Sequence, residues 1–181
     1  MGFQMERGRF DEFLAQLREE NVIYAPKRFV GGGAFSDTDC VRYGEISAAE
    51  EIVWDEKSAY SFKEVLLPVS QTLFYFTEDQ TKTPAAPKKG AVVFLRSCDL
   101  HAVRRLDAIY LRNGPADFYY SRVRSRIRFI VMGCARSFEN CFCVSMGTNR
   151  PEGYAMSIEP QDGGFLLDCP DAAWAAALRS L

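Results

Sequence analysis

The most informative segment of the chain spans residues 90–133 and reads GAVVFLRSCDLHAVRRLDAIYLRNGPADFYYSRVRSRIRFIVMG. It opens with GAVVFLRS (90–97), a short β-branched run behind a glycine, which is typical of a buried strand. Residues 100–111 repeat their apolar side chains at helical spacing and predict an amphipathic helix, while RFIVMG (128–133) predicts a second strand. Strand, helix and strand form a βαβ unit, in which the strands are parallel and the crossover is right-handed.

Two further segments on the N-terminal side have clear patterns. Residues 6–20 predict a helix, because the apolar side chains recur at i, i+3, i+4 and i+7. The segment NVIYAPKRFVGGGAFSDTDCVRYGEI (21–46) predicts strands joined by an irregular loop. We interpret its triple glycine at 31–33 as a flexible turn, because no Lys-Ser/Thr pair follows to make a phosphate-binding loop.

Proline interrupts the apolar segment between these strands and the βαβ unit. EVLLPVSQTLFYF (64–76) contains Pro68, so it cannot be one helix or a central strand, but its bulky apolar side chains predict burial. Ser61 and Glu64 predict a capping box for a short helical turn. The polar segment TEDQTKTPAAPKKG (77–90) predicts an exposed linker or long surface loop.

The C-terminal side completes the expected fold. YAMSIEPQDGGFLLD (154–168) predicts a hairpin that turns at Asp162-Gly163-Gly164, and an alanine-rich helix follows over about 171–181. We therefore expect a mixed α/β (α+β) fold with a βαβ core around residues 90–133, added hairpins and flanking helices. The 181 residues are within the range of a single domain, 1–181.

Composition narrows the classes of partner. The chain has 22 Lys and Arg against 24 Asp and Glu, a formal net charge of −2. This balance argues against nucleic-acid binding through a strongly positive surface. No apolar run approaches the roughly 18 residues needed to cross a bilayer. The first residues, MGFQMERGRF, lack the apolar region of a secretory signal. We expect a cytoplasmic protein with no membrane span and no nucleic-acid partner.

Four of the six cysteines follow the two strands of the βαβ unit. Cys98 comes directly after the first strand, Cys134 directly after the second, and Cys141 and Cys143 lie on the loop beyond it, in the pattern C-x35-C-x6-C-x-C. Ligands of open parallel sheets bind in the crevice beyond the carboxyl ends of the strands. Clustered thiols in a reducing compartment more often bind metal or carry out redox chemistry than form disulfides. The spacing therefore predicts one shared site.

The spacing alone leaves the occupant of that site open. A [4Fe–4S] cluster and a zinc ion both require four thiolates at tetrahedral corners, and buried thiols without any metal are the third interpretation. The remaining cysteines, Cys40 and Cys169, are separate from the four and are interpreted as core or surface thiols.

Three residues beside Cys98 each have two interpretations. Arg96 could place positive charge near a cluster or pair with a surface carboxylate. Asp99 is interpreted as a helix cap rather than a ligand. His101, the single histidine, could donate a hydrogen bond to a cluster, although an ordinary helical role is favoured. Tyr119 and Tyr120 are assigned either to the crevice or to the core.

Three blocks of the chain resemble a known family. They are VWDEKSAYSFKEVLLPVSQTLFYFTED (53–79), FLRSCDLHAVRRLDAIYLRNG (94–114) and NCFCVSMGTNRPEGY (140–154), and they resemble the A-type subunit of anaerobic sulfite reductase. The β subunit of NiFe sulfhydrogenases is similar more distantly. The resemblance implies an electron-transfer subunit of a three-subunit enzyme. In that enzyme a flavin/NADH-binding subunit feeds electrons to a siroheme subunit, which reduces sulfite to sulfide.

The resemblance also bears on the cysteines. Cys98, Cys134, Cys141 and Cys143 match cysteine positions of the family, which implies that they hold an iron–sulfur cluster, expected as [4Fe–4S]. Family members continue into a ferredoxin-like segment with two C-x2-C-x2-C-x3-C runs, and these 181 residues contain neither. We therefore expect an N-terminal domain with no sulfite reductase activity of its own. The alternatives are a cofactor-free scaffold that docks the redox subunits and a zinc-stapled domain.

Overall fold

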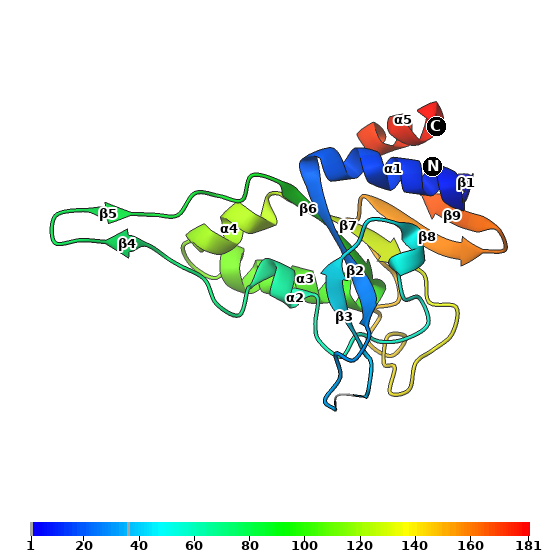
Figure 1. Cartoon of the computed structure of the whole chain (residues 1–181), viewed down its shortest axis with the longest axis horizontal. Coiled ribbons are helices and arrows are strands. Elements are labelled where there is room, and N and C mark those ends of the chain that lie inside the picture. Colours follow the sequence, from blue (N-terminus) through cyan, green and yellow to red (C-terminus); the bar gives the residue numbers. More distant parts are fainter. Residues whose placement is uncertain (1, 36) are drawn as a thin grey trace.

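A mixed β-sheet forms the centre of the computed structural model, which describes residues 2–35 and 37–181 (Figure 1). The strand order of the main sheet is β1-β9-β8-β7-β6-β2-β3. Its strands are β1 (Gly2–Glu6), β2 (Asn21–Phe29), β3 (Cys40–Glu45), β6 (Gly90–Arg96), β7 (Ile127–Met132), β8 (Met156–Gln161) and β9 (Gly164–Asp168). The helices are α1 (Arg7–Glu20), α2 (Lys63–Leu66), α3 (Ser97–Arg112), α4 (Phe118–Arg124) and α5 (Ala172–Ser180), with a 3₁₀ turn, η1 (Ala49–Glu51).

The predicted βαβ unit is confirmed. β6 and β7 pair in parallel from Ala91 opposite Ile127 to Arg96 opposite Met132, and α3 connects them. β2 and β8 extend the parallel region on either side. Strands of this kind are buried on both faces and therefore read as continuous apolar runs.

Alternate residues of β6 enter two separate cores. Val92 and Phe94 pack in the core that also contains α1, η1 and α5, whereas Val93 and Leu95 pack in the core under α2, α3 and α4. All four of these side chains are fully buried. Because successive side chains of a strand point to opposite faces, one apolar run joins both helical layers to the sheet.

Most of the elements that flank the βαβ unit lie where the sequence predicts them, and the structure contains others that were not predicted. α1, the β2–β3 hairpin, the β8–β9 hairpin and α5 lie where they were predicted. The β8–β9 turn is Asp162-Gly163, with Gly163 at φ 84°, and Gly164 already pairs with Gln161. The elements that were not predicted include η1, β1 and α4. β1 pairs antiparallel with β9, and α4 is capped by Asp117, whose carboxylate accepts a hydrogen bond from the Tyr120 backbone N–H at 2.7 Å.

The prediction that residues 64–76 are buried is wrong for most of that segment. After α2 the chain leaves the body, forms the two short strands β4 (Tyr75–Phe76) and β5 (Thr81–Lys82), and returns to β6 (Figure 1). We call residues 67–88 the arm. Val69 is 92% exposed and Phe76 is 76% exposed. The physical reason is that the arm extends away from both cores, so its apolar side chains have no sheet face to join. Residues 77–90 are mainly exposed loop, as predicted, with β5 inside them and Gly90 at the start of β6.

The predicted capping box before α2 is also wrong. α2 begins at Lys63, whose backbone N–H donates to the Ser61 hydroxyl at 3.3 Å. The Glu64 carboxylate instead accepts a hydrogen bond from Arg42 at 3.4 Å. Among the described residues, no helix is both long and apolar enough to cross a membrane.

Candidate functional site

The carboxyl ends of β6 and β7 bring the predicted cysteines to one edge of the sheet. β6 ends at Arg96, so Cys98 lies in the first turn of α3; β7 ends at Met132, two residues before Cys134. The loop of residues 134–153 then returns toward α3 and carries Cys141 and Cys143. The geometry at this edge follows directly from the parallel pairing of the two strands.

Hydrogen bonds from α3 hold that loop in place. The Ser97 hydroxyl donates to the Thr148 carbonyl at 2.7 Å, and His101 Nε2 lies 2.9 Å from the Arg150 carbonyl. Because a carbonyl only accepts, Nε2 carries the proton. Arg104 contacts the Glu152 carboxylate at 2.9 Å. His101 therefore has the structural role that the sequence favoured, although its ring also lines the pocket described next.

All four candidate thiols line one pocket of about 300 Å³. Cys98 and Cys143 are half-buried, whereas Cys134 and Cys141 are exposed. Three cationic side chains, Lys57, Arg96 and Arg105, line the same pocket, and within the described part of the chain no aspartate or glutamate does. A pocket with thiols and cations, and without carboxylates, has the charge needed to hold an anionic group.

Two metal groups take four cysteine thiolates as ligands, a zinc ion and a [4Fe–4S] cluster. Across residues 2–35 and 37–181, no three His, Cys, Asp or Glu side chains lie close enough together to hold one metal ion. A single zinc requires four sulfurs at about 2.3 Å from the same ion. In a [4Fe–4S] cluster each thiolate binds a different iron, so the four sulfurs surround a larger core. Four thiols around one pocket match the number of ligands that either group takes.

Arg96 is a buried cation at the centre of the site. Only 7% of the residue is exposed. Its Nη1 donates to Cys134 Sγ at 3.3 Å, and its Nη2 donates to the carbonyls of Trp54 and Glu56 at 2.8 and 3.2 Å. The guanidinium also lies 4.3 Å from the centre of the Phe138 ring. Its partners are thus a thiol, two carbonyls and a ring, so the alternative of a surface carboxylate pair is wrong.

Asp99 caps α3, although it does so from within the first turn, because α3 begins at Ser97 and not at residue 100 as the sequence predicted. Its Oδ2 accepts a hydrogen bond from the Arg96 backbone N–H at 3.4 Å, in the manner of the third residue of a capping box. Burial raises the pKa of the Asp99 carboxyl above its ordinary value, while hydrogen bonding and charge from Arg96 oppose that rise.

The thiols differ in how readily they lose their protons. Burial, the Asp99 carboxylate and the neighbouring Cys143 together raise the pKa of Cys98 to about 12. By contrast, hydrogen bonds from the backbone N–H and the thiol of Cys143 lower the pKa of the exposed Cys141. Metal binding requires thiolates and displaces the protons of the thiols. Of these two thiols, Cys141 therefore ionises more readily, and Cys98 stays protonated at neutral pH.

Some site residues could not be found from the sequence. Lys57 donates from Nζ to the Glu139 carbonyl at 3.1 Å and lies 5.6 Å from the Phe138 ring, a contact across 82 positions of sequence that no local pattern reveals. Phe142 and Met146 line the pocket yet are 69% and 61% exposed. With Val144, which is 81% exposed, they form what we call the apolar collar of the site.

The other residues considered lie elsewhere. The Tyr120 hydroxyl donates to Asp107 at 2.7 Å inside the α3–α4 core, and the Tyr119 hydroxyl donates to the Leu73 carbonyl at 2.5 Å at the base of the arm, so neither tyrosine covers the crevice. Cys169 is buried, with its thiol 3.5 Å from the Ala155 carbonyl, and Cys40 is half-buried at the start of β3. Both are separate from the pocket, as predicted.

Comparison with known proteins finds a relative of this chain. The chain is 26% identical over 160 residues to the sulfhydrogenase 2 subunit beta of Pyrococcus furiosus. The aligned region covers 87% of this chain and 45% of the relative, so the chain spans less than half of that protein's length. No protein-family model and no solved structure matches the chain. The chain is therefore a distant relative of a sulfhydrogenase β subunit.

Proposed function

We propose that this domain holds a [4Fe–4S] cluster on Cys98, Cys134, Cys141 and Cys143 and relays single electrons within a multi-subunit oxidoreductase. The observation that carries the proposal is the convergence of these thiols, from three separate places in the chain, on one pocket lined by cations. A bound cluster would supply the one-electron couple. The relative's description as a subunit of a sulfhydrogenase supports the electron-transfer role.

The protein's own residues would hold and tune that group. Arg96 would keep its positive charge against Cys134 Sγ because its two carbonyl contacts fix the guanidinium. Hydrogen bonds and positive charge near cluster sulfurs raise the reduction potential. Phe138 and Lys57 would cover one side of the pocket, and the apolar collar would remain at its mouth for a redox partner.

The finer proposal concerns the complex. We infer from the three sequence blocks that the domain belongs to the A-type subunit of an anaerobic sulfite reductase. Electrons would arrive from a flavin/NADH-binding subunit and leave to a siroheme subunit that reduces sulfite to sulfide, in the cytoplasm. This domain would relay electrons without binding sulfite, so the isolated chain would have no sulfite reductase activity.

A second candidate is a scaffold that docks redox subunits without a cofactor. The half-buried Cys98, with a pKa raised to about 12, is what an inert structural thiol would present, and the exposed arm offers a surface for docking. The zinc-stapled variant of this scaffold would use the same four thiols, with one zinc ion in place of a cluster.

Metal analysis separates these candidates. Iron, acid-labile sulfide and zinc would be measured in protein prepared and reconstituted without oxygen. We expect about four irons and four sulfides per chain. We also expect loss of both on Cys98→Ser or Cys134→Ser, but not on the matched control Cys40→Ser. Iron and sulfide near zero in the unmodified chain would overturn the proposal, and one zinc per chain would establish the zinc-stapled scaffold.

A further inference from the structure

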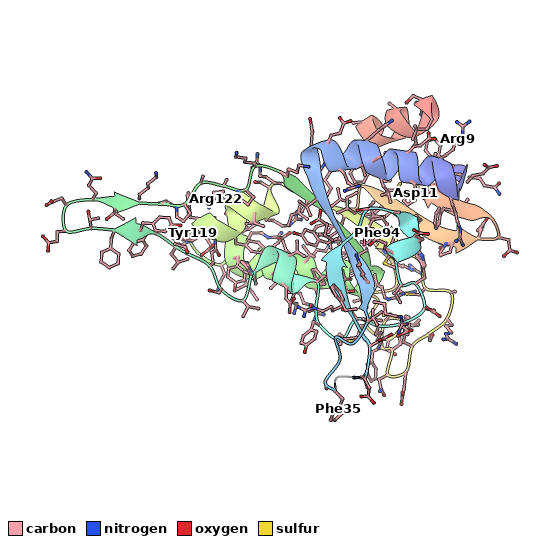
Figure 2. The ribbon with its side chains drawn as sticks, in the orientation of Figure 1. Arg9, Asp11, Phe35, Phe94, Tyr119 and Arg122 are labelled. Carbon is pink, nitrogen blue, oxygen red and sulfur yellow. The ribbon has the colours of Figure 1, made fainter. Side chains whose placement is uncertain are left out.

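The arm exposes apolar side chains to solvent, and two hydrogen bonds attach it to α4. Phe74 and Phe76, at alternate positions of the chain, have ring centres 6.0 Å apart, and Tyr75 between them is 59% exposed. The base is held by the hydrogen bond from the Tyr119 hydroxyl to the Leu73 carbonyl. A second bond runs from Arg122 Nη1 to the Pro84 carbonyl at 2.8 Å (Figure 2). A two-stranded ribbon alone is marginally stable in water, and clustered exposed apolar side chains mark interaction sites. We therefore expect another protein surface to cover these aromatic residues.

Charge is distributed unevenly along the arm. The turn at its tip contains Glu78 and Asp79, closed by the hydrogen bond from the Thr77 backbone N–H to the Gln80 carbonyl at 2.8 Å. Lys82 on β5 lies beside this turn, so the tip carries two negative charges and one positive charge. The opposite end, which we call the root, contains Lys88, Lys89, Arg122 and Arg126. In the described part of the chain, none of these four cations forms an ion pair with a carboxylate. Lys89, Arg122 and Arg126 donate instead to backbone carbonyls.

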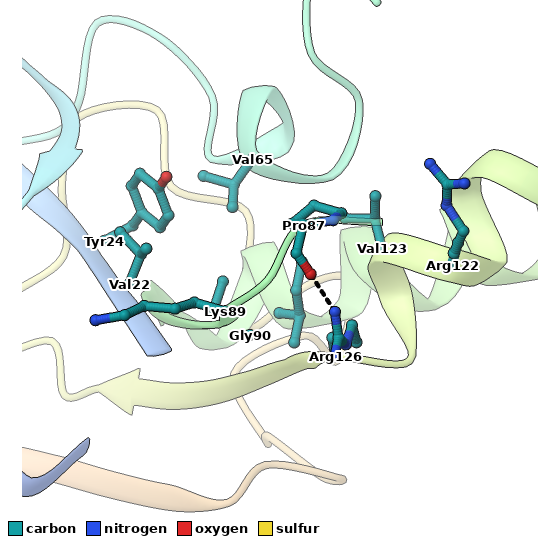
Figure 3. Close-up of a pocket in the computed structure, with 11 residues that line it drawn as sticks. Val22, Tyr24, Val65, Pro87, Lys89, Gly90, Arg122, Val123 and Arg126 are labelled. Carbon is teal, nitrogen blue, oxygen red and sulfur yellow. Dashed lines mark hydrogen bonds between the residues drawn. The ribbon is translucent and has the colours of Figure 1, made fainter. Parts of the chain in front are cut away.

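An apolar pocket opens at the root (Figure 3). Figure 3 shows Val22, Tyr24, Val65 and Val123 around it, with the Arg126 guanidinium donating to the Pro87 carbonyl. The pocket has a volume of about 130 Å³. An apolar cavity of about 150 Å³ is known to accept a benzene ring, so this pocket is of the size that one phenylalanine side chain fills. In addition, Arg122 Nε is buried without a hydrogen-bond acceptor among the described residues.

We propose that the arm mediates dimerisation of this chain. In the dimer the two arms lie antiparallel, so that the acidic tip and Phe76 of each copy contact the basic root and the apolar pocket of the other. A two-fold arrangement makes this contact twice, because the same patch serves both copies. The occupant is a second copy because the tip and the root are complementary in charge and both lie on this one chain. The pocket at the root also has the size of the ring that the tip exposes.

Paired charge reversals test the proposal by sedimentation equilibrium of the whole chain. The tip variant is Glu78→Lys with Asp79→Lys, and the root variant is Lys88→Glu with Lys89→Glu. Each alone places like charges in contact and is expected to weaken dimerisation at least about tenfold. An equimolar mixture is expected to recover the wild-type dimer, because both tip–root contacts are then attractive. The matched control Asp162→Lys alters an exposed turn remote from the arm and is expected to have no effect.

The aromatic contact is tested separately. Phe76→Ser is expected to weaken the dimer at least about tenfold, as loss of a buried aromatic anchor does. Phe35→Ser removes a similarly exposed ring from another loop and serves as its control. Three results would each overturn the proposal. They are a wild-type chain that stays monomeric up to about 100 μM, a mixture no more dimeric than its components, and Phe76→Ser indistinguishable from Phe35→Ser. An arm that binds only a different polypeptide would appear as the first of these.

Discussion

Replacement of Arg96 by methionine removes the buried cation of the site while keeping a long side chain. Two hydrogen bonds to carbonyls disappear, at 2.8 and 3.2 Å, together with the contact to the Phe138 ring. Hydrogen bonds from a charged group contribute about 1.5–3 kcal/mol each when buried. Trp54 is half-buried and Glu56 is exposed, so water replaces part of each bond and about 1 kcal/mol remains for each. The ring contact adds about 0.5–1 kcal/mol.

The free energy of unfolding of metal-free Arg96→Met should therefore fall by about 2.5–3 kcal/mol. For a domain of this size that corresponds to a melting temperature lower by roughly 5–10 °C. Denaturant and thermal unfolding of metal-free protein measure the change. Arg96→Lys should lose about half as much, since one ammonium can reach one carbonyl. The control is Arg105→Met, an exposed residue of the same pocket. An Arg96→Met protein as stable as Arg105→Met would refute the claim that Arg96 fixes this edge of the sheet.

Two further predictions concern other buried polar groups and the thiols. Tyr120→Phe should lower the free energy of unfolding by about 1.5–2 kcal/mol, because it leaves the Asp107 carboxylate without its hydroxyl donor. Tyr119 is more exposed, so Tyr119→Phe should lower the free energy of unfolding by less than half of that amount in the same denaturant titration. In metal-free protein, iodoacetamide should alkylate Cys141 at a lower pH than Cys98, since the pKa of Cys141 is lowered and only the thiolate reacts. The pKa of Cys98 is raised to about 12, so peptide mass spectrometry that finds Cys98 modified before Cys141 would contradict this order.

The sequence predicts the centre of the fold well because local pattern and topology agree there. Apolar runs at 90–97 and 128–133, with a helix between them, have few arrangements other than a parallel pair. Once the strands are parallel, Cys98 and Cys134 must share one edge of the sheet. The convergence of the thiols could thus be predicted without side-chain contacts.

Other features depend on partners far away in the sequence. β1 is a strand because β9, more than 150 positions later, offers it an edge, and residues 2–6 have no pattern that reveals this pairing. The expectation that bulky apolar side chains are buried is wrong for the arm, because side chains such as Phe76 lie outside both hydrophobic cores. The contacts of Arg96 with the carbonyls of Trp54 and Glu56 likewise span about 40 positions and depend on backbone geometry.

The central claim is that the four cysteines hold a one-electron centre. Electron paramagnetic resonance of anaerobically reconstituted protein, reduced with dithionite, tests it most directly. We predict a signal of about one spin per chain that disappears on re-oxidation, is lost in Cys134→Ser and persists in Cys40→Ser. Reconstituted protein that contains no reducible centre, or one that survives loss of Cys134, would contradict it.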